Sequence, residues 1–136
     1  TAQRHGNELA LLFLDINDFK SINDVHGHAA GDRVLCIIAQ RLKSCVRETD
    51  TVARIGGDEF TVLLTEVQSR EAVSKKLDEI HKVMSEPLAP EFGTLKMPLC
   101  SIGVAYYPEH GKDADTLLTH SDSEMYRMKR YRTLES

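Results

Sequence analysis

The feature that most restricts the fold is a short segment of two glycines and two acids between two apolar runs. The tetrapeptide 56–59 (Gly-Gly-Asp-Glu) separates a run that ends at Ile55 from one that begins at Phe60. Two such runs around paired glycines are typical of a β-hairpin, because glycine accepts the positive φ values of tight turns. We expect strands near 51–55 and 60–65, positive φ at the glycines, and both acids at the hairpin tip.

Apolar periodicity predicts the other elements. The unbroken apolar run 9–14 predicts a central strand that is covered on both faces and ends at Asp15. Three-residue spacing predicts one or two helical turns over 16–28, and residues 95–107 have strand character, with close backbone approach at Gly103. The spacing of apolar residues predicts amphipathic helices over 29–47, 69–84 and 114–130.

The helix over 29–47 is expected to carry Asp32 in its first turn, where exposed amides and the helix dipole favour a carboxylate. Strands and helices interleaved around a tight hairpin predict an α/β fold, specifically an α+β sandwich of the split βαβ type. Its central sheet is expected to be mostly antiparallel and flanked by helices.

Composition describes one ordinary domain that spans residues 1–136. The net charge of −4 and the pI near 5.8 argue against nucleic-acid binding, which relies on excess Lys and Arg. No apolar run approaches the roughly 20 residues of a membrane span, and the first residues lack a signal-peptide pattern. We expect a cytoplasmic domain without membrane contact.

The positions of Asp15 and Asp58 are compatible with a metal-binding site. Asp15 ends the first strand and Asp58 lies at the hairpin tip, so both overhang the same edge of the sheet if those strands are neighbours. Two-metal phosphoryl transfer needs such a pair, because acidic oxygens hold hard cations and leave positions for substrate phosphate. Taken alone, the pattern also fits two unrelated surface acids.

Motifs along nearly the whole chain resemble one family. They include the segments 15–20 (Asp-Ile-Asn-Asp-Phe-Lys), 23–24 (Asn-Asp), 27–32 (Gly-His-Ala-Ala-Gly-Asp), 56–60 (Gly-Gly-Asp-Glu-Phe) and 101–105 (Ser-Ile-Gly-Val-Ala), together with Pro108, Gly111, Asp122, Met125, Tyr126 and Lys129. In these motifs the chain resembles the GGDEF-domain diguanylate cyclases, a bacterial signal-transduction family.

The resemblance implies a nucleotidyltransferase that condenses two GTP molecules into cyclic di-GMP and pyrophosphate. The 3′-hydroxyl attacks the α-phosphate, on a fold similar to adenylyl cyclase and polymerase palm domains. The implied cofactor is Mg²⁺ or Mn²⁺, two ions per active half-site. Because one domain holds one GTP and the product has two phosphodiester links, a homodimer is implied. A regulatory domain is expected to precede this one in the parent protein.

The resemblance also assigns roles to residues. Asp15, the backbone carbonyl of Ile16 and Asp58 match metal-binding positions. Asp58 also matches the position that deprotonates the 3′-hydroxyl, and Glu59 the position that assists the metals. The implied substrate-binding residues are Asn23 and Asp32 for the guanine edge, His28 beside them, and Lys20 and Lys129 for phosphates.

The side chains implied for binding guanine and the product have suitable hydrogen-bonding groups. Asn23 offers a donor and an acceptor, and Asp32 accepts from the guanine N1 and N2 hydrogens, so the pair could exclude adenine. Arg47 and Asp50 fit an Arg-x-x-Asp pattern that, in the family, forms an inhibitory product site. Arginine can grip guanine or phosphate bidentately there.

Two departures and three alternatives accompany this interpretation. The family's segment ahead of the first strand and its Gly-Arg-Asn after the last helix are missing here, which we interpret as a trimmed domain or a partly ordered chain. The main alternative is a non-catalytic signalling module that binds GTP or cyclic di-GMP. A palm-type polymerase would need a basic template groove, and zinc at His26 and His28 would need further ligands.

Overall fold

The apolar run near the start of the chain forms an interior strand of a four-stranded sheet. The computed structural model describes residues 8–135, with side chains from Glu8 through Arg127. In chain order the elements are β1 (Glu8–Ile16), α1 (Phe19–His26), α2 (His28–Ser44), β2 (Thr51–Arg54), β3 (Glu59–Val67), α3 (Arg70–Met84), the 3₁₀ helix η1 (Pro90–Phe92), β4 (Cys100–Tyr107) and α4 (Ala114–Glu135).

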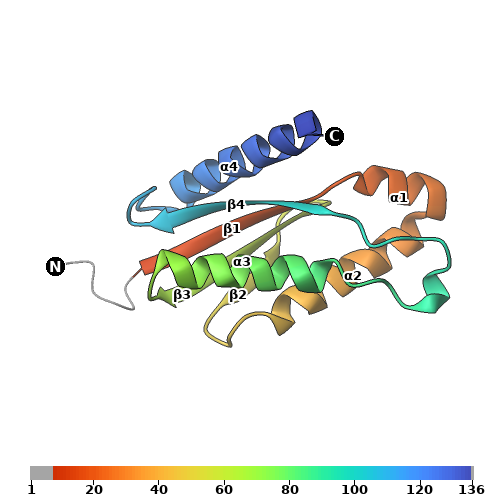
Figure 1. The fold of residues 1–136 in the computed structure, drawn as a ribbon, viewed down its shortest axis with the longest axis horizontal. Helices are drawn as coiled ribbons and strands as arrows, with labels where there is room; N and C mark the ends of the chain where they lie inside the picture. The colour runs from red at the N-terminus through yellow and green to blue at the C-terminus, as the bar shows by residue number, and fades with distance from the viewer. Residues whose placement is uncertain (1–7, 136) are drawn as a thin grey trace.

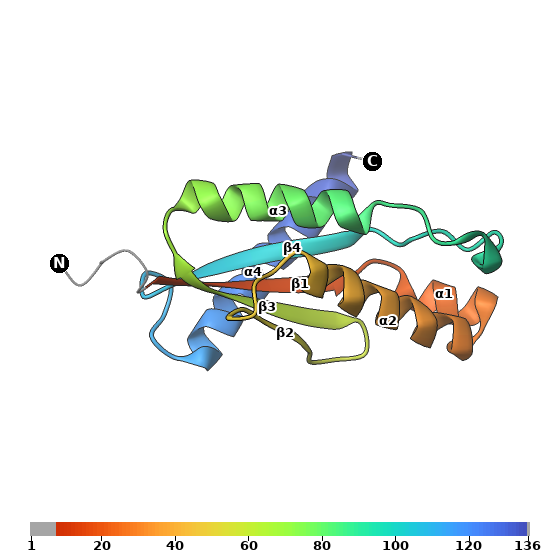
Figure 2. The same ribbon diagram turned by 90° about the horizontal axis from the view of Figure 1, so that it is seen from below.

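Helices cover both faces of this sheet (Figures 1 and 2). The strand order is β2-β3-β1-β4, and every neighbouring pair is antiparallel. α2 and α3 lie on one face, and α4 lies along β4 and β1 on the other. The predicted α+β sandwich of the split βαβ type, with a central antiparallel sheet, is confirmed.

β1 is buried on both sides, as its apolar run predicts. Leu12 and Leu14 belong to the larger hydrophobic core, whereas Leu11 packs with Ala105 and Leu117 in a smaller core beneath α4. A strand inside the sheet with helices on both faces needs apolar side chains in both directions, so alternation is absent. No helix within residues 8–135 has the length and hydrophobicity of a membrane span.

Two predicted boundaries are wrong in ways that matter for the site. β4 begins at Cys100 rather than near residue 95, because its partner β1 ends at Ile16, the residue that pairs with Cys100. α2 begins at His28, so Asp32 lies beyond its first turn, which carries no acid. Asp32 is therefore not stabilised by the exposed amides of that turn.

Candidate active site

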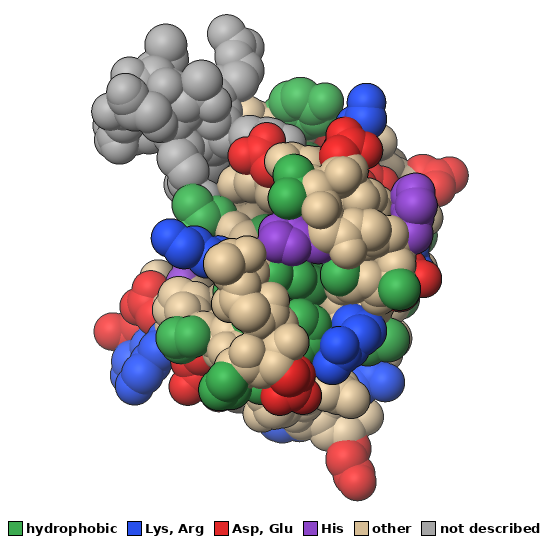
Figure 3. All heavy atoms as spheres, turned by 90° about the vertical axis from the view of Figure 1, so that its right-hand side faces the viewer, with side chains coloured by type: hydrophobic (Ala, Val, Ile, Leu, Met, Phe, Trp, Pro, Cys, Tyr) green, Lys and Arg blue, Asp and Glu red, His purple; other side chains and the backbone are tan. Residues whose placement is uncertain are grey.

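The acids at positions 15, 58 and 59 lie at one end of the sheet. Asp15 is in register with Glu59 of β3 and with Ser101 of β4. The amide of Ile16 donates a hydrogen bond of 2.9 Å to the carbonyl oxygen of Asp58. Asp15 and Asp58 therefore lie at the same end of the sheet, as their sequence positions predict. Figure 3 looks onto this end of the molecule, where charged side chains surround hydrophobic ones.

Arg54 holds the hairpin tip. Its guanidinium group donates hydrogen bonds of 3.0 Å to the carbonyl oxygens of Gly56 and Gly57. The expected positive φ at these glycines is wrong. A Cβ at position 56 would lie 2.6 Å from Oε1 of Glu59, at the end of a flexible side chain that could rotate away. The contacts from Arg54 therefore fix the backbone of the turn that carries the two acids.

Negative charge accumulates around Glu59. Partial burial raises the pKa of its carboxyl group, and the carboxylates of Asp15, Asp58 and Asp122 raise that pKa further. Asp122 comes from α4 on the other face of the sheet, and no role was predicted for it. Mutual repulsion of these acids favours bound cations. Lys129, a predicted phosphate ligand on α4, lies outside the residues whose side chains are described.

The donor set at this edge fits a hard divalent cation. Asp15, Asp58 and the carbonyl group of Ile16 offer oxygen, and Mg²⁺ usually takes one or two carboxylates and completes its shell with water and substrate phosphate. In the described part of the chain, no three His, Cys, Asp or Glu side chains form a metal site. The residues thus suit an ion shared with substrate phosphates, and the zinc alternative at His26 and His28 has no third ligand there.

The segment after Asp15 is anchored to the start of β4. The amide of Asn17 donates to the carbonyl oxygen of Leu99 at 2.9 Å, and the hydroxyl of Ser101 lies 3.2 Å from Oδ1 of Asn17, to which it donates. Asp18 has a left-handed backbone conformation with φ of 56°, which Asp tolerates better than most residues. These contacts turn the chain sharply from β1 into α1 beside the acids.

The junction of α1 and α2 brings the two predicted guanine ligands to one region. Oδ1 of Asn23 lies over Gly31, so closely that a Cβ at position 31 would be 1.9 Å from it. Asp32 is the next residue, and it is exposed, as are Lys20 and His28, whereas Asn23 is half-buried. Gly31 therefore allows the Asn23 amide group to sit against α2 near Asp32.

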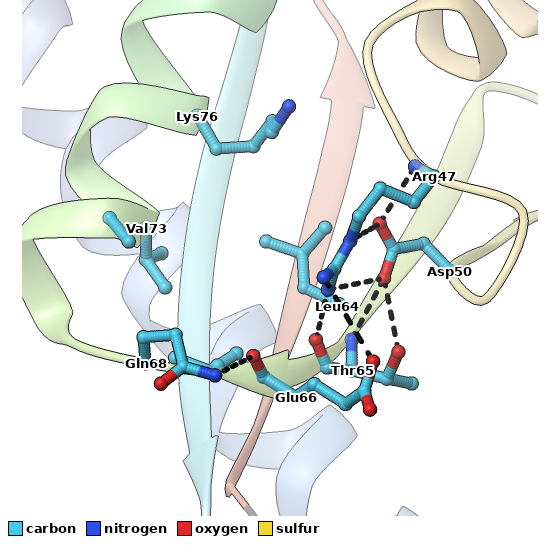
Figure 4. A pocket seen from close by; sticks show the side chains of 10 residues that line it. Arg47, Asp50, Leu64, Thr65, Glu66, Gln68, Val73 and Lys76 are labelled. Atoms are coloured by element: carbon cyan, nitrogen blue, oxygen red, sulfur yellow. Dashed lines mark hydrogen bonds and ion pairs between the residues drawn. The ribbon is translucent and has the colours of Figure 1, made fainter. Parts of the chain in front are cut away.

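A pocket of about 200 Å³ lies between the α2–β2 turn, β3 and α3. Arg47 and Asp50 lie on one side of it, and Lys76 and Val73 lie on the other (Figure 4). The amide of Arg47 donates to Oδ2 of Asp50 at 2.9 Å, and its Nε lies 3.5 Å from the same oxygen. The guanidinium group also donates to the carbonyl oxygen of Thr65. The structure thus brings together the predicted Arg-x-x-Asp pair.

The side chain of Asp50 is buried, and its carboxylate accepts hydrogen bonds from Arg47 and Thr65. Its Oδ1 accepts from the amide and hydroxyl groups of Thr65 at 2.9 and 3.3 Å. The side chain of Asp50 is 2% exposed and that of Arg47 is 56% exposed. Burial raises the pKa of Asp50, but the hydrogen bonds from Thr65 and Arg47 and the charge of Arg47 outweigh burial and lower it. Asp50 therefore positions Arg47, which is the side chain that a ligand would meet.

Replacing Asp50 by Asn is expected to lower the free energy of unfolding by about 2 kcal/mol, because the new NH₂ group faces hydrogen-bond donors. Because the pKa of Asp50 is lower in the folded state than its ordinary value, the ionised carboxylate stabilises the wild type fully above roughly pH 4. This stabilisation is lost as the pH falls through the folded-state pKa of Asp50. The difference in the free energy of unfolding between wild type and variant therefore shrinks in acid. Urea denaturation at several pH values measures it. Glu48→Gln, in the same exposed turn, should change stability by less than about 0.5 kcal/mol.

The chain matches known proteins over almost its full length. The family model described as "Diguanylate cyclase, GGDEF domain" matches residues 1–133. Diguanylate cyclase TpbB of Pseudomonas aeruginosa is 44% identical over 129 residues, which are 95% of this chain and 30% of that protein. Cyclic di-GMP phosphodiesterase NbdA of the same species is 40% identical over 126 residues, which are 91% of this chain and 16% of that protein. The chain thus spans less than a third of these relatives.

Solved structures agree with the sequence comparison. The crystal structure of the GGDEF domain of TpbB, also called YfiN, from P. aeruginosa has a TM-score of 0.87 and 44% identity, and the match covers 96% of this chain and 81% of that one. The GGDEF domain of DgcB from Caulobacter crescentus, in complex with c-di-GMP, has a TM-score of 0.81 and 27% identity, with 95% and 76% covered. On fold, motifs and comparison alike, this chain belongs to the GGDEF-domain family of diguanylate cyclases.

Proposed function

We propose that this domain is the catalytic domain of a diguanylate cyclase, which condenses two GTP molecules into cyclic di-GMP and pyrophosphate. The observation that carries the proposal is the junction of β1 with the hairpin. There the hydrogen bond from Ile16 to Asp58 puts the acids at 15 and 58 on one edge. The 44% identical relative that is named a diguanylate cyclase supports it.

In the proposed reaction, the 3′-hydroxyl oxygen of one GTP bonds to the α-phosphorus of the other, and the bond to the bridging oxygen breaks, so that pyrophosphate leaves. Asp15, Asp58 and the carbonyl group of Ile16 would hold Mg²⁺ or Mn²⁺, two ions per half-site, and Glu59 would assist in binding them. Bound divalent cations supply charge neutralisation at the α-phosphate and a lower pKa for the hydroxyl group. Asp58 accepts the hydroxyl proton.

Substrate selection falls to the junction of α1 and α2. Asn23 and Asp32 hydrogen-bond the guanine edge, with His28 beside them. Lys20, exposed in the first turn of α1, and Lys129 bind phosphates. An adenine base would present a donor and an acceptor in the wrong places and leave polar groups unpaired, which is a strong basis for discrimination.

The working unit in this proposal is a homodimer in the cytoplasm, where GTP is available. Each domain holds one GTP, and two domains must face each other for both phosphodiester links to form. A regulatory domain in the parent protein would control their approach. TpbB is long enough for such a domain, since the matched region is 30% of it.

We also propose that the pocket around Arg47 and Asp50 binds the product and inhibits the enzyme. A cationic guanidinium group held at a pocket wall suits a ligand with two phosphates and two guanine bases. The structural relative DgcB was solved in complex with c-di-GMP, which supports product binding by this kind of domain. Inhibition would then be a coupling between two sites, which acts equally in both directions for binding.

One finding favours a second candidate, the non-catalytic module that binds GTP or cyclic di-GMP. NbdA, which is 40% identical in the matched region, is named a cyclic di-GMP phosphodiesterase. A domain of this family can therefore belong to a protein that is named for the opposite reaction. The intact residues of the Gly-Gly-Asp-Glu-Phe motif at 56–60 favour the enzyme over this module.

The experiment is to incubate the intact parent protein with GTP and Mg²⁺ and to detect products by liquid chromatography and mass spectrometry. We expect cyclic di-GMP and pyrophosphate from GTP, and no cyclic dinucleotide from ATP. Binding of GTP without product would support the signalling module instead. Equal turnover of ATP and GTP would contradict the roles of Asn23 and Asp32.

A further inference from the structure

An acid lines the Arg47 pocket beside the guanidinium group. Oε1 of Glu66 lies 4.0 Å from Nη1 of Arg47, and both side chains are exposed. Figure 4 shows this ion pair in the same pocket as the Asp50 contacts. Unlike Asp50, whose carboxylate is 2% exposed and positions Arg47 from the interior, Glu66 reaches Arg47 from the solvent side. The carboxylate of Glu66 thus lies where an anionic ligand of Arg47 would bind.

A β-bulge determines where Glu66 points. Ala10 pairs with Leu64 and Glu8 pairs with Val67, so two residues of β3 face a single residue of β1. Glu66 is one of the two, and its φ of 52° is in the left-handed region that glutamate seldom adopts. Without the bulge, Glu66 would share the face of Leu64, which is buried. Bulges re-aim side chains in this way, and here Glu66 is exposed at the rim of the pocket, while Leu64 and Val67 of the same strand line its buried wall.

We propose that Glu66 sets the affinity of this pocket for its ligand by competing with the ligand's phosphates for Arg47. The inference rests on the proposed product site. The charge of Glu66 lies beside the guanidinium group that Asp50 positions and repels an arriving phosphate, so feedback begins only at a higher product concentration. The class of ligand it discriminates against is dianionic, and cyclic di-GMP is a member of that class.

The size of the effect follows from the exposure of the pair. Between exposed unit charges a few ångströms apart, the interaction is on the order of 1 kcal/mol, and salt weakens it. Removing the charge of Glu66 is therefore expected to tighten binding of cyclic di-GMP by about fivefold. Such a change moves the inhibitory concentration by the same factor.

Isothermal titration of cyclic di-GMP into the full chain tests the proposal at fixed ionic strength. Glu66→Gln removes the charge and keeps the shape, and we expect about fivefold tighter binding. Glu48→Gln, an equal change of net charge at an exposed residue that does not line the pocket, should bind like wild type within twofold. Arg47→Ala should abolish binding.

The outcomes separate the two proposals. If Arg47→Ala abolishes binding but Glu66→Gln binds like wild type, the role of Glu66 is overturned and the product site stands. If wild type does not bind, or Arg47→Ala binds normally, the product site itself fails and the inference fails with it.

A second variant separates charge from backbone strain at position 66. Glu66→Asn also removes the charge, and Asn suits a left-handed conformation better than Glu. We expect Asn and Gln to tighten binding equally, because the charge is the cause. If only the Asn variant binds more tightly, backbone conformation sets the affinity and the electrostatic proposal is overturned.

Discussion

Replacing Asp58 by Asn is expected to lower the rate of cyclic di-GMP formation by about a thousandfold or more. The amide keeps the size of the side chain but carries no charge to hold a cation and cannot take the 3′-hydroxyl proton. The backbone carbonyl of Asp58, which accepts from Ile16, is unchanged, so the hairpin should remain in place. Initial rates with GTP and Mg²⁺, followed by chromatography of the product, measure the loss.

A matched control is Asp78→Asn, the same change at an exposed position on α3. It should alter the rate by less than about twofold, since Asp78 is exposed on α3 and is not among the charges that act on Glu59. If the Asp58 variant melts like wild type and still forms product within tenfold of the wild-type rate, Asp58 is neither the base nor an essential metal ligand.

Replacing Gly103 by Ala is expected to lower the free energy of unfolding by about 3 kcal/mol or more. A Cβ at position 103 would lie 2.0 Å from the carbonyl oxygen of Ser121 and 2.3 Å from the amide nitrogen of Met125. Both are backbone atoms of α4, so no side-chain rotation can relieve the overlap, and the helix must move off the sheet. Because α4 also carries Asp122, the shift should disturb the charge around Glu59.

Urea denaturation of the domain measures this loss. Gly57→Ala is the control for stability, because nothing lies within 4 Å of the Cβ that it adds. It should change the free energy of unfolding by less than about 1 kcal/mol. If Gly103→Ala were as mild as Gly57→Ala, then α4 would not pack against β4 as closely as described.

The arrangement of elements could be predicted because each signal is local. The unbroken apolar run 9–14 has no polar face, and only a strand covered on both sides accommodates it. The segment of glycines and acids at 56–59 predicted the hairpin, and this placed Asp58 beside Asp15 once the two strands paired. Gly103 predicted close approach, and α4 provides it.

Other features depend on contacts that no local pattern encodes. Arg54 could be found only from the path of the turn, because an arginine at a strand end is common. The charge of Asp122 acts on Glu59 from an element distant in the sequence, and the family motif singled out Asp122 without a role. The positive φ expected at Gly56 was wrong, because the turn at 56–57 forms without the left-handed backbone that paired glycines suggest.

We expect Asp15 and Asp58 to share divalent cations across a small gap. Crystals of the domain grown with Mn²⁺ and a non-hydrolysable GTP analogue allow the metal to be located by anomalous diffraction. We predict two manganese peaks about 3.5–4 Å apart, bound by the carboxylates of Asp15 and Asp58 and by phosphate oxygens. Manganese bound to the nucleotide with neither carboxylate in its coordination shell would contradict the claim.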